Sequence, residues 1–399
     1  MTEQSKNKQT IAVRGTGQKS LHGEHSEAVY FTSGYVFENA AQAAARFAGD
    51  EAGAIYGRLT NPTVQSFESH LAMLEDAEYC VATATGMAAI NCVFTGLLNG
   101  GDHVVASSSL FGSTIILLDK IFSRFGIETT FVPINELAAW QEAVKVNTKL
   151  FFLETPSNPL CELGDVRAIA DIAHSAGAQL IVDNTYNTPI LQNPLQQGAD
   201  VVVHSATKYI DGQGRMLAGA VVTNDEDINE VVFSVLRTAG ASLSPMNAWS
   251  MNQALQTLPL RMNAHCDNAL RVARWLETHP AVERVYYPGL ESHPQYQLAT
   301  QQQSGYGGML SFEIKGDKAA AWHVMDSCEM ISLSVNLGDT RTIITHPAST
   351  SHGRLTPEER ERAGVSDNLI RLSVGLEAVD DVITDLSRGL DTLLLSPVN

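Results

Sequence analysis

The chain has 399 residues, of which 44% are hydrophobic and 18% are charged, the composition of an ordinary globular protein. It carries 26 Lys and Arg residues against 44 Asp and Glu residues, which gives a formal net charge of −18. A surface for nucleic acid or for an anionic membrane needs a basic patch, so the charge argues against both kinds of partner. Anionic small molecules stay compatible, because a local cluster of donors can oppose the net charge.

Cysteine usage and hydropathy indicate a cytoplasmic protein. No C-x-x-C pair occurs, so we expect reduced thiols and neither a disulfide framework nor a metal site. The polar start shows no apolar segment of a signal peptide, and no apolar run approaches the roughly 20 residues of a membrane span. The five scattered cysteines are Cys80, Cys92, Cys161, Cys266 and Cys328.

The length predicts two domains and an additional arm. Residues 1–60 are polar and dotted with glycine, with Ala-rich helical character at 40–47, and we interpret them as an N-terminal arm. From residue 61 onward, strand and helix patterns alternate, which is typical of an α/β domain with a mostly parallel sheet covered on both faces. The expected strands lie at 78–82, 102–107, 129–133, 149–154, 179–183 and 201–203.

The pattern changes near residue 256, so we assign residues 61–256 to the α/β domain and 257–399 to a smaller α+β domain. A long helix is expected to run to residue 275, and a last helix to close the chain. Strands are expected at 282–287, 308–314 and 369–375. In the larger domain, functional residues should lie at the carboxyl ends of the parallel strands.

Lys208 is the most informative residue. It follows the apolar strand 201–203 in the run His-Ser-Ala-Thr-Lys, and a glycine-rich stretch comes after it. A lysine there, next to the hydroxyl residues Ser205 and Thr207, suggests an amine that forms a Schiff base beside a phosphate cradle. A solvated surface lysine after a strand would show the same local sequence, so the choice between the two interpretations depends on the rest of the chain.

Three other segments fall at predicted strand ends. Gly86 and Met87 open a helix after a strand, where backbone N–H groups can face a phosphate, although simple close packing gives the same pattern. Asn158 lies in a Pro-Ser-Asn-Pro turn that also reads as a plain rigid turn. Asp183 ends an apolar strand, where a carboxylate needs a partner such as a pyridinium nitrogen, a metal ion or a helix N-terminus. With Lys208, these segments suit one ligand, pyridoxal 5′-phosphate (PLP).

At this point the chain resembles the PLP-dependent enzymes of cysteine and methionine metabolism, over about residues 12–395. This resemblance implies the aspartate-aminotransferase-like fold of PLP-dependent transferases. The motifs that carry it are Tyr56-Gly-Arg58-Leu-Thr-Asn-Pro-Thr63, the turn at Gly86, the strand ending at Asp183, Ser205-Ala-Thr-Lys208-Tyr209, His346-Pro-Ala-Ser349 and Arg371-Leu-Ser-Val-Gly-Leu-Glu377.

The resemblance also implies roles for these residues. Lys208 would be the Schiff-base lysine, Asp183 the partner of the pyridinium nitrogen, and Asn158 the hydrogen-bond partner of the cofactor's 3-oxygen. Arg371 would bind the substrate α-carboxylate, because a guanidinium can hold a carboxylate through two hydrogen bonds. The phosphate cradle would be formed by Gly86, Met87, Ser205 and Thr207, with Tyr56 and Arg58 reaching it from the neighbouring subunit.

A shared active site implies an obligate oligomer, and the resemblance favours a homotetramer made of two active dimers. Departures from the family pattern indicate the branch within it. Phe111 stands where many members have a stacking tyrosine, and Ser113 where methionine γ-lyases have a cysteine. Asn336 replaces a usual serine, and Asn336-Leu-Gly-Asp-Thr-Arg341 resembles the sulfhydrylase branch, so Asn336 and Arg341 are expected at the substrate.

The implied reaction replaces the succinyl group of O-succinyl-L-homoserine with sulfide, giving L-homocysteine and succinate for methionine biosynthesis. Lys208 would carry most of the proton traffic, because Phe111 lacks a phenol. Alternatives within the class are a cystathionine γ-synthase that uses cysteine, an O-acetylhomoserine sulfhydrylase and a methionine γ-lyase. An inactive family member with a binding role is the alternative from another class, and the intact set of Lys208, Asp183 and Arg371 disfavours it.

Overall fold

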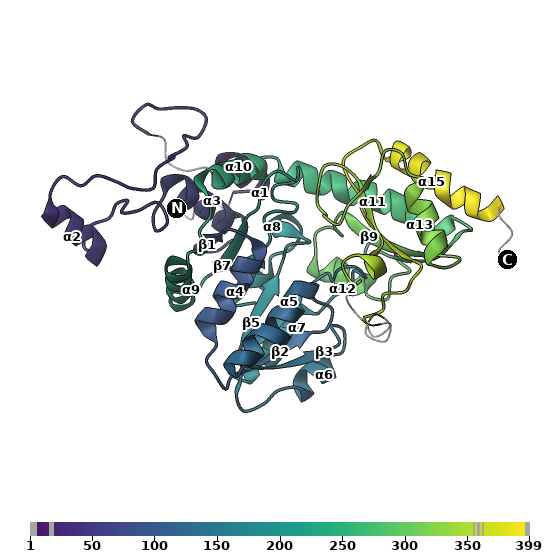
Figure 1. The fold of residues 1–399 in the computed structure, drawn as a ribbon, viewed down its shortest axis with the longest axis horizontal. Helices are drawn as coiled ribbons and strands as arrows, with labels where there is room; N and C mark the ends of the chain where they lie inside the picture. The colour runs from purple at the N-terminus through teal and green to yellow at the C-terminus, as the bar shows by residue number, and fades with distance from the viewer. Residues whose placement is uncertain (1–5, 16–19, 354–355, 357–359, 361–362, 396–399) are drawn as a thin grey trace.

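The computed structural model describes residues 6–15, 20–353, 356, 360 and 363–395. It contains a seven-stranded sheet in the order β1-β7-β6-β5-β4-β2-β3 and a five-stranded sheet in the order β10-β11-β12-β9-β8. Figure 1 shows the two sheets side by side, each with its own helices. The mostly parallel α/β architecture expected from the sequence is confirmed, whereas the exact domain boundary near residue 256 stays a prediction.

The seven-stranded sheet is parallel except for β7, which pairs antiparallel with both β6 and β1. Its central strands are buried on both faces, as the continuous apolar runs of the sequence predict. The strands are β1 (Tyr79–Thr83), β2 (His103–Ser107), β3 (Glu128–Val132), β4 (Thr148–Glu154), β5 (Gln179–Asp183), β6 (Val201–His204) and β7 (Gly219–Thr223).

Alternate side chains of these strands enter two different cores. Leu150 and Phe152 of β4 pack with α4 and α9, whereas Phe151 and Leu153 pack with α6 and α7 on the opposite face. The helices of this part are α3 (Pro62–Leu74), α4 (Gly86–Leu97), α5 (Gly112–Ile116), α6 (Leu137–Glu142), α7 (Val166–Ser175), α8 (Thr188–Leu191), α9 (Glu226–Ala239) and α10 (Pro245–Leu255). Strand ends therefore open at one edge of a sheet that is covered on both sides.

The second sheet packs its apolar face against α11, α13 and α15 in a core of its own. Its strands are β8 (Val282–Tyr286), β9 (Met309–Ile314), β10 (Ser332–Leu333), β11 (Ile343–Thr345) and β12 (Leu369–Ser373). Its helices are α11 (Leu258–Thr278), α12 (Tyr296–Gln302), α13 (Lys318–Asp326) and α15 (Val379–Leu395). None of the helices in the described residues is both long and apolar enough to cross a membrane.

Several features differ from the sequence-based expectation. The elements β7, α9, β10 and β11 were not predicted; β7 is reached from β6 through the loop 205–218 and pairs with it antiparallel. After β2 the chain forms α5, which is followed by a π-helical turn (Leu117–Ile121) and a 3-10 turn (Phe122–Phe125). The arm contains a second helix, α1 (Lys8–Arg14), which packs against α3 because Ala12 is fully buried there.

The rest of the N-terminal segment extends from the body, and α2 (Ala40–Ala48) lies at its far end (Figure 1). No residue of α2 is buried, although one side of the helix is apolar. Phe31, Val36 and Phe47 are 71%, 97% and 66% exposed. Burial of such side chains is favourable, so this segment has the composition of a contact surface.

Candidate active site

The amine of Lys208 lies in the loop after β6, where the chain turns before β7. Its Nζ donates a hydrogen bond to Oδ1 of Asn336 at 2.7 Å. Burial, and then the positive charge of Arg371, lower the pKa of Lys208 to about 8. A lysine in this position has a neutral, nucleophilic amine near neutral pH far more often than a solvated lysine.

Two carboxylates end adjacent strands beside this loop. Asp183 at the end of β5 is the register partner of Glu154 at the end of β4. Burial raises the pKa of both, and the charge of Asp183 also raises that of Glu154. Asp183 Oδ1 accepts from the N–H of Thr185 at 3.0 Å, which opposes the rise of the pKa of Asp183. Two half-buried acids side by side favour a site that binds a cation between or beside them.

Glu154 was not singled out by the sequence reasoning. Its Oε2 accepts the backbone N–H of Phe111 at 2.7 Å, and Phe111 begins α5 with its ring 45% exposed. Glu154 thereby fixes the backbone that carries the aromatic ring. The signal that could have found it was its place as the last residue of the predicted strand 149–154, at the same sheet edge as Asp183.

The N-terminus of α4 meets the Lys208 loop closely. A Cβ added at Gly86 would lie 2.6 Å from the Cβ of Ser205, so only glycine permits this approach. Thr85 caps the helix by accepting from the N–H of Ala88 at 3.0 Å. The N–H groups of Gly86 and Met87 come earlier in the helix, where no intrahelical acceptor exists. These donors and the helix dipole favour an anion at this point.

The hydroxyl residues of the loop are held by the backbone around them. The N–H of Ser205 donates to Oγ1 of Thr185 at 2.7 Å. Oγ1 of Thr207 donates to the carbonyl of Ala218 at 3.2 Å and accepts its N–H at 3.1 Å. Hydrogen bonds between its two ends therefore close the loop between β6 and β7, and they hold Lys208 at a defined position.

Arg371, on β12 of the second sheet, is only 3% exposed. Its Nη1 donates to Oδ1 of Asn158 at 3.2 Å, and its Nη2 to the carbonyls of Val335 and Asn336 at 3.0 and 2.9 Å. Its Nε has no hydrogen-bond partner, and burial lowers the pKa of Arg371 to about 10. No carboxylate of the described residues pairs with it. A buried guanidinium in this state is suited to an anionic group from outside the chain.

Three expected site residues lie apart from this cluster. Tyr56 and Arg58 are exposed on the N-terminal segment, with the guanidinium 5.7 Å from the centroid of the tyrosine ring, and Arg58 donates to the carbonyl of Arg237. Arg341 is paired with Asp339, at 3.1 Å from Nε to Oδ1, and its side chain is 68% exposed. The structure thus brings Lys208, Asn336, Arg371 and Asn158 together, and it leaves Tyr56, Arg58 and Arg341 outside this group.

Metal ligation is not indicated by the described part of the chain, where no group of three or more His, Cys, Asp or Glu side chains is arranged to hold a metal ion. The donor set at the strand ends fits a different group. It offers a half-buried amine, a half-buried acid, open N–H groups at a helix N-terminus and a guanidinium with an unpartnered N–H. An aldehyde-bearing phosphate and an α-amino acid together match these features.

Comparison with known proteins identifies the family. Residues 9–391 match the model of the Cys/Met metabolism PLP-dependent enzymes. An O-succinylhomoserine sulfhydrylase of Pseudomonas aeruginosa is 57% identical over 96% of this chain and 95% of its own length. An L-methionine gamma-lyase of Fusobacterium nucleatum subsp. polymorphum is 45% identical over 96% and 98% of the two chains.

A solved structure from Campylobacter jejuni, provisionally assigned as an O-acetylhomoserine (thiol)-lyase, has a TM-score of 0.93 and 36% identity over 97% of this chain and 100% of its own. That structure carries a lysine joined to the pyridoxyl group. The chain described here belongs to the PLP-dependent enzymes of Cys/Met metabolism. It is an enzyme, and its cofactor is pyridoxal 5′-phosphate.

Proposed function

We propose that this enzyme replaces the succinyl group of O-succinyl-L-homoserine with sulfide, giving L-homocysteine and succinate as a step of methionine biosynthesis. The observation that carries the proposal is the junction of Lys208, Asn336 and Arg371. Asn336 accepts from the amine of Lys208 through its side chain and from Arg371 through its carbonyl. An amine and a guanidinium held by one residue suit the α-amino and α-carboxylate ends of one amino acid.

Each residue then has a distinct task. Arg371 binds the substrate α-carboxylate, which supplies the acceptor that its Nε lacks. Lys208 attaches the cofactor and afterwards moves protons at the substrate carbons, a role suited to an amine whose pKa is lowered to about 8. Asp183 would hold the proton of the cofactor ring nitrogen, and Asn158, whose Oδ1 accepts from Arg371, would contact the cofactor.

The cofactor supplies an electron sink that stabilises negative charge at the substrate α-carbon. Phe111 offers a ring face for stacking but no acid or base, so proton transfer rests on Lys208. The phosphate is assigned to Gly86, Met87, Ser205 and Thr207, because open N–H groups and hydroxyl residues meet there.

The exposed N-terminal segment supports a shared active site. Tyr56 and Arg58 are exposed between α2 and α3, so we assign them to the phosphate site of a neighbouring subunit in a homotetramer of two active dimers. Exposed Phe31 and Phe47 on the same segment would be buried by that contact. We also assign the enzyme to the cytoplasm, in keeping with its five free cysteines.

Substrate choice rests on two supports. The relative from Pseudomonas aeruginosa is named for O-succinylhomoserine, and Asn336 lies where the chain departs from the family serine toward the sulfhydrylase pattern. A methionine γ-lyase activity is the second candidate, supported by the 45% identical relative of that name. Ser113 in place of the cysteine of those lyases counts against it.

The test is a product assay on the purified holoenzyme. O-succinylhomoserine is supplied with sulfide in one reaction and with cysteine in a second, O-acetylhomoserine with sulfide is a third, and methionine alone is a fourth. We expect homocysteine as the main product, formed fastest from the succinyl ester and sulfide. Cystathionine as the main product would reassign the enzyme to cystathionine γ-synthase, and methanethiol from methionine would reassign it to the lyases.

A further inference from the structure

Glu75, at the end of α3, is a fully buried carboxylate that the proposed chemistry does not use. Its Oε1 accepts hydrogen bonds from Nδ2 of Asn184 at 3.2 Å and from Nε2 of His204 at 2.5 Å. Both partners are fully or almost fully buried as well. A buried carboxylate is costly unless it is paired, so the two donors have to be present together for Glu75 to be stable there.

The two donors stand at the ends of the strands that carry the site. Asn184 directly follows Asp183 at the end of β5, and His204 ends β6, four residues before Lys208. These strands are neighbours, with Asp183 opposite Val203, and the N–H of Asn184 donates to the carbonyl of Val203 at 3.0 Å. One oxygen of Glu75 therefore joins the two strand ends from which Asp183 and Lys208 extend.

His204 adds an electrostatic link to this geometric one. Its Nε2 faces Glu75, and its Nδ1 is buried without a hydrogen-bond partner, so Glu75 is the charged group with which the ring forms a hydrogen bond. The positive charge of His204 partly opposes the burial that raises the pKa of Asp183.

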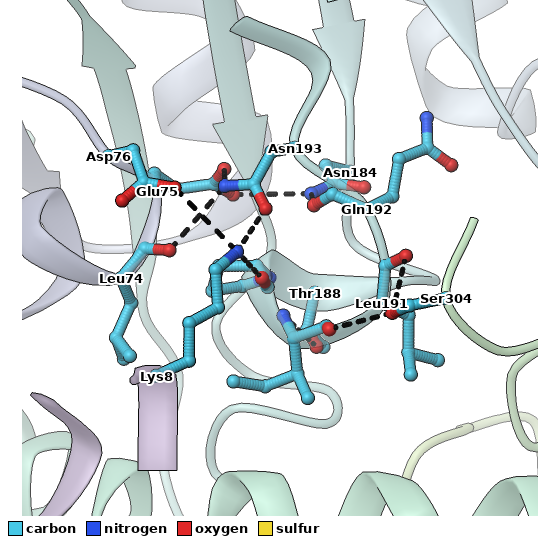
Figure 2. A network of polar contacts seen from close by, with 12 residues as sticks. Lys8, Leu74, Glu75, Asp76, Asn184, Thr188, Leu191, Gln192, Asn193 and Ser304 are labelled. Carbon is cyan, nitrogen blue, oxygen red and sulfur yellow. Dashed lines mark hydrogen bonds and ion pairs between the residues drawn. The ribbon is translucent and has the colours of Figure 1, made fainter. Parts of the chain in front are cut away.

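A chain of polar contacts ties Glu75 to the N-terminal helix, as Figure 2 shows. Nδ2 of Asn193 donates to Oε2 of Glu75 at 3.3 Å. Oδ1 of Asn193 accepts from the amine of Lys8 on α1, which also donates to the carbonyl of Pro189 at 2.5 Å. Lys8 thus supplies a positive charge on the far side of Glu75, and its Nζ is 4.0 Å from Oδ2 of Asp76.

We propose that Glu75 is a positioning residue for cofactor binding: with His204 and Asn184 it aligns the ends of β5 and β6, keeps Asp183 ionised, and is itself held by Lys8 through Asn193. Asp183 must be a carboxylate to pair with a protonated ring nitrogen. The inference rests on the proposed roles of Asp183 and Lys208, and it is independent of which acylated homoserine and which thiol are used.

The titratable groups around Glu75 and His204 come from six elements. The charges of these groups influence any pH dependence of cofactor binding. The groups are Lys8 of α1, Glu68 and Glu75 of α3, Asp76 directly after α3, Cys80 of β1, Glu154 of β4, Asp183 of β5 and His204 of β6. Glu154 and Cys80 both have a pKa raised by burial. Neither forms a hydrogen bond with Glu75 or His204, so both are left unchanged in the test.

The experiment measures the dissociation constant of PLP against pH, by titration of the apoprotein and its visible absorbance near ~420 nm. For Glu75→Gln we expect the constant to rise about tenfold at pH 7. We also expect the acid limb of the binding curve to move to higher pH. Without the Glu75 carboxylate, the ring of His204 loses its hydrogen-bond partner, so the electrostatic support that opposes the rise of the pKa of Asp183 weakens and Asp183 is protonated at a higher pH. A purely structural defect would weaken binding equally at all pH values and leave the acid limb in place.

Glu68→Gln is the matched control, because Glu68 lies on the same helix and accepts the N–H of Ala82 without contact to either strand end. We expect its PLP binding to match that of the unchanged protein at every pH. Lys8→Met should raise the dissociation constant less than Glu75→Gln does, about twofold to threefold, because Lys8 is separated from the strand ends by three contacts, through Asn193 and Glu75.

The outcomes separate the two proposals. A folded Glu75→Gln variant with unchanged dissociation constant and acid limb would overturn the positioning role. If Glu75→Gln does not fold, Lys8→Met and Asn193→Ala test the positioning role instead. Unchanged PLP binding in both of these variants would also overturn the positioning role. Lys208→Ala run beside them should lose the visible band. A retained band there would instead refute the assignment of Lys208, on which the inference depends.

Discussion

The lowered pKa of Lys208 makes a quantitative prediction for capture of the cofactor by the apoprotein. Only the neutral amine can attack the cofactor's aldehyde group. At pH 7 an amine with a pKa of about 8 is about 9% neutral, whereas one at the ordinary value of 10.5 is about 0.03% neutral. Burial and the charge of Arg371 therefore raise the reactive fraction about 300-fold at this pH.

The assay follows the visible absorbance after apoprotein is mixed with PLP in a stopped-flow instrument between pH 6 and 10. The rate should rise with pH and level off with a midpoint near 8. In Arg371→Met the midpoint should move to higher pH, because one of the two causes of the lowered pKa is removed, but it should stay below 10.5 since burial is the larger cause. Lys208→Ala is the control and should show no capture phase.

A capture rate that still rises steeply above pH 9 in the unchanged protein would refute the reasoning, because Lys208 would then titrate as a solvated lysine. The stability of the apoprotein gives an independent check. The unfolded chain binds the Lys208 proton more tightly than the folded chain does, so the contribution of this group to folding stability should increase as pH rises from about 8 to 10.5. The free energy of unfolding, measured with urea at these two pH values and compared with that of Lys208→Met, isolates the contribution of Lys208.

Four further predictions concern the substrate and the subunit contact. Arg371→Lys should raise KM for the acylated homoserine about a hundredfold with a smaller effect on kcat, because a lysine cannot bind a carboxylate through two hydrogen bonds. An unchanged KM in steady-state kinetics would contradict this prediction. Asn336→Ser should increase 2-oxobutyrate release relative to homocysteine, measured by product ratio, because Lys208 loses its amide acceptor; an unchanged ratio means that Asn336 does not tune the reaction. Phe111→Tyr should also increase 2-oxobutyrate release relative to homocysteine, because the phenol adds an acid/base group at the ring. A product ratio equal to that of the unchanged protein would count against any role of position 111 in specificity. Arg58→Ala should be inactive alone and regain about a quarter of the activity when subunits are mixed with Lys208→Ala, since one site of each mixed dimer is intact; no recovery would place Arg58 in its own subunit's site.

The local pattern of the sequence was sufficient for the elements that carry Lys208 and Asp183. Both follow short apolar strands in a segment where strands and helices alternate, and the carboxyl ends of parallel strands share one edge. The close approach at Gly86 could also be expected, because a glycine that opens a helix after a strand permits contact with a neighbouring loop. These features depend on residues near one another in the chain.

The antiparallel strand β7 could not be foreseen in the same way. Its five residues, Gly-Ala-Val-Val-Thr, are all buried and lack the alternation of a half-buried strand, because both faces are covered. Its direction depends on the loop from Thr207 to Ala218, whose hydrogen bonds return the chain beside β6. Glu154 was missed for a related reason: its importance comes from Asp183 and Phe111 on other segments, not from its own sequence neighbours.

The sequence alone thus determined the class of fold, the family motifs and the strand-end positions of Lys208, Asp183 and Gly86, because periodicity and turn chemistry act over a few residues. Only the tertiary structure decided which distant groups meet. Arg371 reaches Asn158 across 213 residues, and Lys208 reaches Asn336 across 128. Glu75 joins two strand ends from a third element, α3. Such contacts depend on the order in which strands pair and sheets pack, a property of the whole chain that no local pattern contains.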